Sequence, residues 1–242
     1  MFSFFKKRKL VTDISWLGVD IHSHILPGID DGAKDVEQSL GYVTQLQALG
    51  FEKLFFTPHI FSELYPNTPE TIKPALKLVQ DGLSAVRNTI PVGAAAEHMV
   101  DYNFIVHPDL LCLPNKHILI EMSYLSETPN IEKVVFDLQI SGYTVVLAHP
   151  ERYNFYHKTV DRYHRLRDMG CLFQLNLLAV TGYYGREVKQ ASDYLLKNKL
   201  YDLAATDLHH DKHLSLLTRA VRNGELFNLI GQYEFKNRAL FL

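Results

Sequence analysis

Cysteine is scarce in this 242-residue sequence, which contains only Cys112 and Cys171. The two residues lie in different segments and form no C-x-x-C pair, so neither a disulfide framework nor a thiolate zinc site is indicated. Free cysteines of this kind are most often buried. Any metal site in this chain is therefore expected to use nitrogen and oxygen ligands.

Long hydrophobic runs and an excess of charge of one sign are also missing. No apolar stretch reaches the roughly 18 uninterrupted residues that a transmembrane helix needs. The formal net charge is only -2, so the strongly basic stripe that indicates nucleic-acid binding is not expected. Hydrophobic residues make up 47% and charged residues 21% of the chain, as in ordinary globular proteins. The composition predicts a cytoplasmic protein without a nucleic-acid partner, and it leaves the oligomeric state open.

The first 15 residues differ from the rest of the chain. Phe2, Phe4 and Phe5 precede a basic cluster at residues 6–9, but no long apolar segment follows the charges as it does in a secretory signal. Residues 1–15 are therefore expected to form a loosely ordered terminal segment, and residues 16–242 a single domain. Weak contact of this segment with an anionic membrane surface stays open as an alternative.

Short apolar runs alternate with helical patterns along the chain. Apolar runs predict about seven strands, at residues 17–21, 53–58, 92–96, 117–120, 144–148, 172–175 and 203–206. Helical spacing predicts helices at residues 35–49, 68–87, 131–140, 160–169, 187–196 and 214–226. Such alternation is typical of βαβ units with a parallel sheet. Because no linker divides the chain, one closed or nearly closed α/β barrel is expected.

Most of these apolar runs end in a residue that binds metals well. His22 and His24 follow the first run with one small residue between them, so on a strand both side chains point the same way. Because the carboxyl ends of neighbouring parallel strands meet in one place, the metal-binding residues of all runs are expected to converge. They are His22, His24, Asp31, His59, Glu97, Glu121, His149, Asp207 and His209.

These nine residue types favour one kind of chemistry. A set of histidines and carboxylates without cysteine suits Zn, Mn or Fe. Nine ligands exceed the needs of one ion and suit three, with one carboxylate shared. Closely spaced ions activate water and neutralise charge on a phosphoryl oxygen, so phosphoester hydrolysis by a metal-activated hydroxide is expected. Amidohydrolysis and deamination, the alternatives among metallohydrolases, usually work with fewer ions.

Four motifs resemble the polymerase and histidinol phosphatase (PHP) superfamily. They are DIHSHILPGIDDG at residues 20–32, TPH at 57–59, AHPERY at 148–153 and TDLH at 206–209. More narrowly, they resemble the superfamily's bacterial manganese-dependent tyrosine phosphatases of capsule and exopolysaccharide operons, and the match covers nearly the whole chain from Trp16 onward. The resemblance implies a distorted (β/α)7 TIM-like barrel with a trinuclear site at the carboxyl ends of its strands.

The resemblance also implies how the ligands divide among three divalent ions, with Mn favoured and Fe or Zn as alternatives. The first ion takes His22, His24, Glu97 and Asp207, the second Glu97, Glu121 and His149, and the third Asp31, His59 and His209. Glu97 bridges the first two. The implied substrate is the phosphotyrosine of a bacterial tyrosine kinase that regulates polysaccharide synthesis.

Two basic residues are candidates for binding the phosphate. Arg152 lies three residues past His149, where its guanidinium can make bidentate N–H contacts with a phosphoryl group. A surface salt bridge is the alternative for this arginine. The related phosphatases carry a second arginine shortly after the last metal-binding histidine, whereas this chain has Lys212 nearby. Lysine is a point charge and lacks the planar fork, so its substitution for that arginine stays open.

Four further residues flank the expected site. Tyr184 and Arg186 belong to a loop at the rim of the barrel and are candidate substrate contacts, although such loop residues are often only surface. Asp30 and Glu151 are adjacent to expected ligands and are predicted to orient them without binding metal.

Three functions stay open at this point. The favoured one is a metal-dependent protein-tyrosine phosphatase. The second is a PHP phosphatase of a small molecule such as histidinol phosphate or a sugar phosphate. The third is a barrel that binds the kinase without catalysis, which the complete ligand set disfavours because nine buried polar groups are costly without a role.

Overall fold

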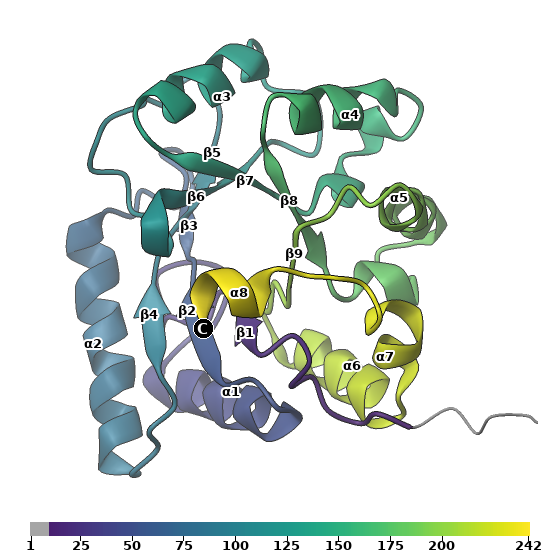
Figure 1. Ribbon diagram of the computed structural model, residues 1–242. Helices are drawn as coiled ribbons and strands as arrows, with labels where there is room; N and C mark the ends of the chain where they lie inside the picture. The colour runs from purple at the N-terminus through teal and green to yellow at the C-terminus, as the bar shows by residue number, and fades with distance from the viewer. Residues whose placement is uncertain (1–9) are drawn as a thin grey trace, which may run out of the picture.

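Parallel strands form the centre of the molecule, and helices surround them (Figure 1). The structure is a computed structural model that describes residues 10–242. The strands are β1 (Val19–Asp20), β2 (Lys53–Phe56), β3 (His59–Ile60), β4 (Val92–Ala94), β5 (Glu97–Met99), β6 (His117–Glu121), β7 (Thr144–Ala148), β8 (Leu172–Asn176) and β9 (Leu203–Ala205).

The strands are joined into a ring by parallel pairing. One sheet has the order β1-β2-β4, and the other has the order β3-β5-β6-β7-β8-β9. After a short interruption, β3 continues the path of β2, and β5 continues that of β4. The backbone N–H of Asp207 donates to the His22 carbonyl (2.9 Å) and that of His24 to the Leu208 carbonyl (2.9 Å), which links the last strand to the first. The expected α/β fold with parallel strands is confirmed, although the connection between β5 and β6 contains a short 3-10 helix at residues 114–116 in place of an α-helix.

Helices follow most strands and cover the outside of the ring. They are α1 (Val36–Leu49), α2 (Pro69–Ala85), α3 (Ile131–Ile140), α4 (Asp161–Asp168), α5 (Arg186–Lys197), α6 (Asp211–Arg222), α7 (Glu225–Ile230) and α8 (Asn237–Phe241). Short 3-10 helices lie at η1 (Pro114–Lys116), η2 (Pro150–Arg152), η3 (Asn154–Tyr156) and η4 (Ala179–Thr181).

The expected helix at residues 214–226 is wrong in its extent, because two helices occupy this region. Gly224 separates α6 from α7 with a φ of 74°, a left-handed conformation that glycine adopts without steric cost. The short helix α8 near the C-terminus was not predicted.

Apolar side chains pack in two layers. The larger layer lies between the strands and the outer helices, where Leu46, Val79 and Leu138 are fully buried. The smaller layer fills the inside of the barrel with residues such as Leu119 and Val146. Because the interior is filled, a substrate can reach the molecule's polar centre only at the rim of the barrel.

The amino-terminal end of the described chain packs against the barrel domain. Ile14 is fully buried, and its backbone N–H donates to the Leu49 carbonyl at 2.8 Å. Phe2, Phe4, Phe5 and the basic cluster lie outside the described residues, as does the membrane contact considered for them. None of the helices formed by residues 10–242 is both long and apolar enough to span a membrane.

Candidate metal centre

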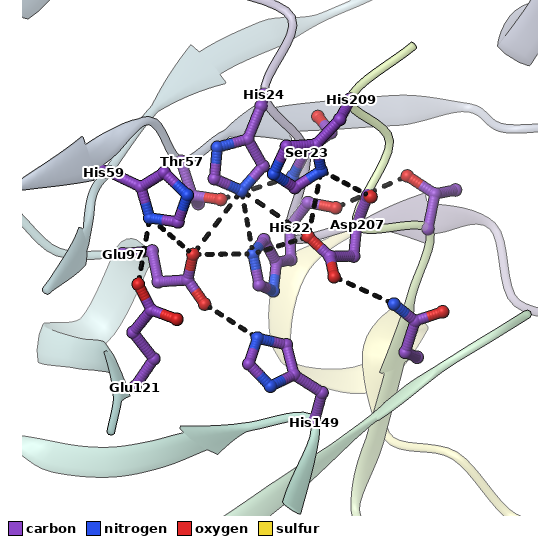
Figure 2. Close-up of polar contacts among 12 residues, drawn as sticks. His22, Ser23, His24, Thr57, His59, Glu97, Glu121, His149, Asp207 and His209 are labelled. Atoms are coloured by element: carbon purple, nitrogen blue, oxygen red, sulfur yellow. Dashed lines mark hydrogen bonds and ion pairs between the residues drawn. The ribbon is translucent and has the colours of Figure 1, made fainter. Parts of the chain in front are cut away.

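The nine expected ligands lie together at the carboxyl ends of the strands, and Figure 2 labels eight of them. His22 and His24 follow β1, His59 begins β3 and Glu97 begins β5. Glu121 ends β6, and the remaining residues lie in loops that follow β1, β7 and β9: Asp31, His149, Asp207 and His209. The ends of most strands therefore supply one site, although β8 supplies none of the nine residues.

Four ligand atoms form a tight group at the centre of the site. The Nε2 atoms of His22 and His24 lie 3.2 Å apart. Glu97 Oε2 lies 3.3 Å and 3.4 Å from these two nitrogens, and Asp207 Oδ1 lies 3.3 Å and 3.5 Å from them. Ligands about 2.1 Å from one ion in a tetrahedron are roughly 3.4 Å apart. The two histidine nitrogens and Asp207 Oδ1 therefore lie close enough together for a single divalent ion, whereas Glu97 belongs to other groups, one with His22 and His149 and one with His59 and Glu121.

Neighbouring polar groups orient the two central histidines. His22 Nδ1 lies 2.9 Å from Gln174 Oε1, and His24 Nδ1 lies 2.9 Å from Asp30 Oδ2. An acceptor on Nδ1 holds the proton there and directs the lone pair of Nε2 into the centre. The loop that carries Asp30 passes so close to His24 that a Cβ on Gly32 would lie 1.8 Å from the His24 carbonyl oxygen, so only glycine fits.

The other ligands are grouped partly as expected. Asp31 and His209 lie near His59, with Asp31 Oδ1 3.5 Å from His59 Nε2 and 3.6 Å from His209 Nε2. Glu121 Oε1, however, lies 2.9 Å from His59 Nδ1. Glu121 therefore groups with His59 and Glu97, while His149 groups with Glu97 through a contact of 3.0 Å.

Burial and neighbouring carboxylates shift the pKa values of the histidines at this site in opposite directions. Burial favours the neutral form of His24, but the Asp30 carboxylate beside it raises the pKa of His24 well above its usual value. At His59 burial again lowers the pKa, yet contacts with Glu121 and Glu97 outweigh it and raise the pKa to about 10. The site therefore stabilises positive charge at its centre, which is the electrostatic condition for binding cations.

The hydrogen bonding of the buried Glu97 carboxylate also fits a metal site. Glu97 Oε2 is buried and lies 3.1–3.4 Å from nitrogens of His59, His22 and His24, yet it makes no well-aligned hydrogen bond among the described residues. Buried polar groups are rarely left in this state, because an unmade hydrogen bond costs about 1–3 kcal/mol. Several donors that converge without pairing are typical of a ligand shell.

A cavity of about 720 Å³ opens onto the metal residues. Arg152 lies in its wall, and its Nη1 donates to Asp207 Oδ2 at 2.8 Å. Lys212 also lines the cavity, with Nζ 5.4 Å from the centre of the Tyr183 ring. Tyr184 lines the cavity as expected, whereas Arg186 is exposed at the start of α5 and is not among the lining residues.

The sequence did not reveal several polar and aromatic residues around the site. Asn176 Nδ2 donates to Asp207 Oδ2 at 2.8 Å, and Gln174 supports His22. Both side chains lie at the carboxyl end of β8, and this alternation of polar residues on a buried strand was the available signal. Tyr124 packs against Arg152 and carried no such signal.

Glu151 was predicted to orient a neighbouring ligand, but its carboxylate contacts residues outside the nine. Its carboxylate is fully buried, and it accepts hydrogen bonds from the Asn176 N–H (2.8 Å) and the Tyr201 hydroxyl (2.8 Å). Burial raises the pKa of Glu151. The residue holds the end of β8 and lies outside the groups of potential metal ligands.

A model of the family described as "Capsular polysaccharide synthesis, CpsB/CapC" matches residues 18–220. The chain belongs to this family. The tyrosine-protein phosphatase YwqE of Bacillus subtilis is 30% identical over 200 residues, which cover 80% of this chain and 78% of YwqE. The tyrosine-protein phosphatase CpsB of Streptococcus pneumoniae is 26% identical over 201 residues, which cover 79% of this chain and 83% of CpsB.

Solved structures agree with this membership of the CpsB/CapC family. One solved chain, from crystal structures of YwqE from Bacillus subtilis and CpsB from Streptococcus pneumoniae described as unique metal-dependent tyrosine phosphatases, matches with a TM-score of 0.74 and 27% identity, covering 93% of this chain and 96% of the other. The lactonase Lmo2620 from Listeria monocytogenes matches with a TM-score of 0.53 and 13% identity, covering 93% and 91% of the two chains, and shares the fold alone. The family and the fold predicted from the four sequence motifs are confirmed.

Proposed function

We propose that this CpsB/CapC family member is a metal-dependent phosphatase that hydrolyses phosphotyrosine on a bacterial tyrosine kinase controlling capsular or exopolysaccharide synthesis. Its relatives are named tyrosine-protein phosphatases. The observation that carries the proposal is the position of Arg152 in the wall of the cavity that Glu97, His149 and Asp207 also line, with its guanidinium hydrogen-bonded to Asp207. We place the reaction in the cytoplasm, because ATP-dependent tyrosine phosphorylation occurs there.

We further propose that the nine residues hold three divalent ions, with Mn favoured and Glu97 shared. The nitrogen and oxygen donors and their spacing support this reading. Ions bound there supply a hydroxide nucleophile at neutral pH and neutralise charge on the phosphoryl oxygens. The contact between Glu121 and His59 indicates that His59, Glu97 and Glu121 together would hold one of the ions.

The chain's own residues bind and orient the phosphate ester. Arg152 uses one N–H group for Asp207, its hydrogen-bond partner among the described residues, and so keeps other N–H groups for a phosphoryl oxygen. Aromatic side chains such as Tyr65 and Tyr183 line the cavity and provide apolar contact for the phenyl ring of the ester. Lys212 adds positive charge at the rim.

Hydrolysis assays test the proposed substrate. A phosphotyrosine peptide and histidinol phosphate are compared with and without added Mn at matched protein concentration. Metal-dependent hydrolysis of the peptide, with little turnover of histidinol phosphate, is expected. Activity on histidinol phosphate alone would replace the proposal with a small-molecule phosphatase, and absence of turnover with both substrates would favour a non-catalytic barrel.

Metal analysis tests the number of ions. Protein purified without chelator and then loaded with Mn should contain about three ions per chain, as the ligand count implies. Less than one ion per chain, measured by mass spectrometry of the digested protein, would contradict the trinuclear site.

A further inference from the structure

Two tyrosine rings flank the guanidinium of Arg152. The central guanidinium carbon lies 4.6 Å from the centre of the Tyr124 ring and 4.5 Å from that of the Tyr184 ring. Tyr124 follows β6, while Tyr184 lies between β8 and α5, so only the tertiary structure brings them to the same arginine. A cation within about 6 Å of an aromatic face is attracted by the ring.

We propose that Tyr124 and Tyr184 are positioning residues that clamp Arg152 and direct its N–H edge at the phosphate, an inference that rests on the proposed phosphatase function. The donor groups of a guanidinium all lie in its plane. Two rings this close to the guanidinium restrict the directions from which other groups can reach its N–H donors. The clamp therefore presents paired donors to a phosphoryl group in one orientation and reduces the entropy that phosphate binding would otherwise cost.

Hydrogen bonds from Asn176 connect Tyr184 to the metal centre. Asn176 Nδ2 donates both to the Tyr184 hydroxyl (3.0 Å) and to Asp207 Oδ2 (2.8 Å). The same Asp207 oxygen accepts the hydrogen bond from Arg152. Burial raises the pKa of Tyr184, so its hydroxyl stays neutral at physiological pH. One asparagine thus holds a ring of the clamp and the carboxylate that anchors the clamped arginine.

The two carboxylate oxygens of Asp207 face different groups. Its Oδ1 faces His22 and His24 at 3.3 Å and 3.5 Å, whereas its Oδ2 faces Arg152 and Asn176 at 2.8 Å each. The carboxylate therefore separates a metal side from a phosphate side. Loss of the tyrosine rings is expected to affect phosphate binding and to leave metal content unchanged.

Lys212 provides an internal contrast. Among residues 10–242, one ring lies near its Nζ, that of Tyr183 at 5.4 Å, and the side chain is exposed. It has one aromatic neighbour where Arg152 has two, so its ammonium group keeps more freedom. The clamp predicts that Arg152 makes the larger contribution to phosphate affinity.

Paired substitutions separate the ring from the hydroxyl. Tyr124→Leu and Tyr184→Leu remove the rings, and Tyr124→Phe and Tyr184→Phe keep them. In the metal-loaded full-length protein, the leucine variants should lose about fivefold to tenfold in kcat/KM for a phosphotyrosine peptide, in keeping with a cation–π contact. The phenylalanine variants should recover most of this loss, and the metal content should be the same in all four. Tyr194→Leu, on the outer helix α5, is the matched control.

A double-mutant cycle decides whether the rings act through Arg152. In an Arg152→Ala background, Tyr124→Leu should lower kcat/KM less than twofold, because no guanidinium is left to position. Equal losses with and without Arg152 would overturn the clamp. Tyr124 is 39% exposed, so its replacement does not empty the core and keeps the test usable if Tyr184→Leu fails to fold.

Orthophosphate binding separates failure of the clamp from failure of the proposed function. Titration calorimetry of the metal-loaded protein should show weaker orthophosphate binding by about fivefold to tenfold in the leucine variants. If the natural protein hydrolyses no phosphate ester, the proposed function fails, while this comparison still tests the clamp. If the natural protein is active and the leucine variants match it in binding and turnover, only the clamp is overturned.

Discussion

The two ends of the barrel use polar groups in opposite ways. At the amino end, α8 lies across the strands, and Asn237 Nδ2 donates to the carbonyl groups of Val19 (2.9 Å) and Ala204 (2.7 Å). Lys53 Nζ donates to the carbonyl of Phe241 (2.8 Å), whose ring packs beneath the apolar interior. Each polar group named here is paired, and the contacts hold strands together.

At the carboxyl end, side chains are held close together without such pairing. Glu97 Oε2 meets three imidazoles and makes no well-aligned hydrogen bond among the described residues. His149 and Asp207 have left-handed backbone conformations, with φ of 34° and 50°. Such conformations cost about 1 kcal/mol or more each in non-glycine residues and cluster at functional sites. The rest of the fold must therefore stabilise this end.

The difference shows that stability and ligand binding are separated along the barrel axis. Substitutions at the amino end are expected to lower the free energy of unfolding and leave the reaction of the folded molecules unchanged. Substitutions at the carboxyl end are expected to lower turnover and to leave the free energy of unfolding unchanged. A substitution at either end that changed both quantities would contradict the separation.

The largest effect is expected at Glu97. Glu97→Gln keeps the size of the side chain and removes the charge that several ions or histidines share, so turnover of a phosphotyrosine peptide should fall about a thousandfold, equivalent to roughly 4 kcal/mol. Turnover is measured at saturating Mn, together with metal content and denaturant unfolding. Activity above about a tenth of the natural level would remove Glu97 from the centre of the site.

At the opposite end, Asn237→Ala should destabilise the protein. The substitution leaves the Val19 carbonyl and both backbone polar groups of Ala204 without their amide partner. A loss of about 2–4 kcal/mol in the free energy of unfolding is expected from urea denaturation at fixed metal concentration. Turnover per folded molecule should stay unchanged, and a drop in that value would show that the two ends are coupled.

Arg152→Ala gives a smaller, purely functional effect. Loss of a contact worth about 2–3 kcal/mol in the transition state should reduce the catalytic rate about 10-fold to 100-fold. Metal content should be retained, because Arg152 lies outside the groups of potential metal ligands. Arg186→Ala is the matched control, since Arg186 is exposed away from the cavity. An unchanged rate in Arg152→Ala would leave this arginine as a salt-bridge partner of Asp207.

The smallest effect is expected for the pH dependence of metal affinity, which reports proton release on metal binding. The pKa of His59 is raised to about 10, so its imidazole binds a proton at neutral pH, whereas a metal ligand must be neutral. Metal binding therefore displaces protons, and the apparent affinity should rise about tenfold per pH unit for each proton released, until the pH reaches the raised pKa. Calorimetry in buffers of different ionisation enthalpy measures the release, which Asn237→Ala should leave unchanged. An affinity that is constant between about pH 6 and about pH 8 would contradict it.

Much of the site was predictable because its signals are local. Alternation along a strand predicted that His22 and His24 point the same way, and their Nε2 atoms lie 3.2 Å apart. The rule that parallel strands present their carboxyl ends together predicted the convergence of residues as distant as Glu121 and Asp207. Neither inference required knowledge of side-chain packing.

Other features depended on contacts that no local pattern encodes. Glu121 contacts His59, a grouping that differs from the expected division. Arg186 follows Tyr184 closely in the chain, but the first turn of α5 carries it to the surface. Gly224, in contrast, was a local signal for the break between α6 and α7.

The βα alternation, the family and the residues that gather at the strand ends could all be inferred from the amino-acid sequence. These follow from backbone periodicity and from motifs whose spacing is short. Which atoms face one another depends on the folded chain: Tyr124 and Tyr184 lie beside Arg152, and α8 covers the amino end of the barrel. Such contacts join segments far apart in the chain, and their geometry depends on how the whole barrel packs.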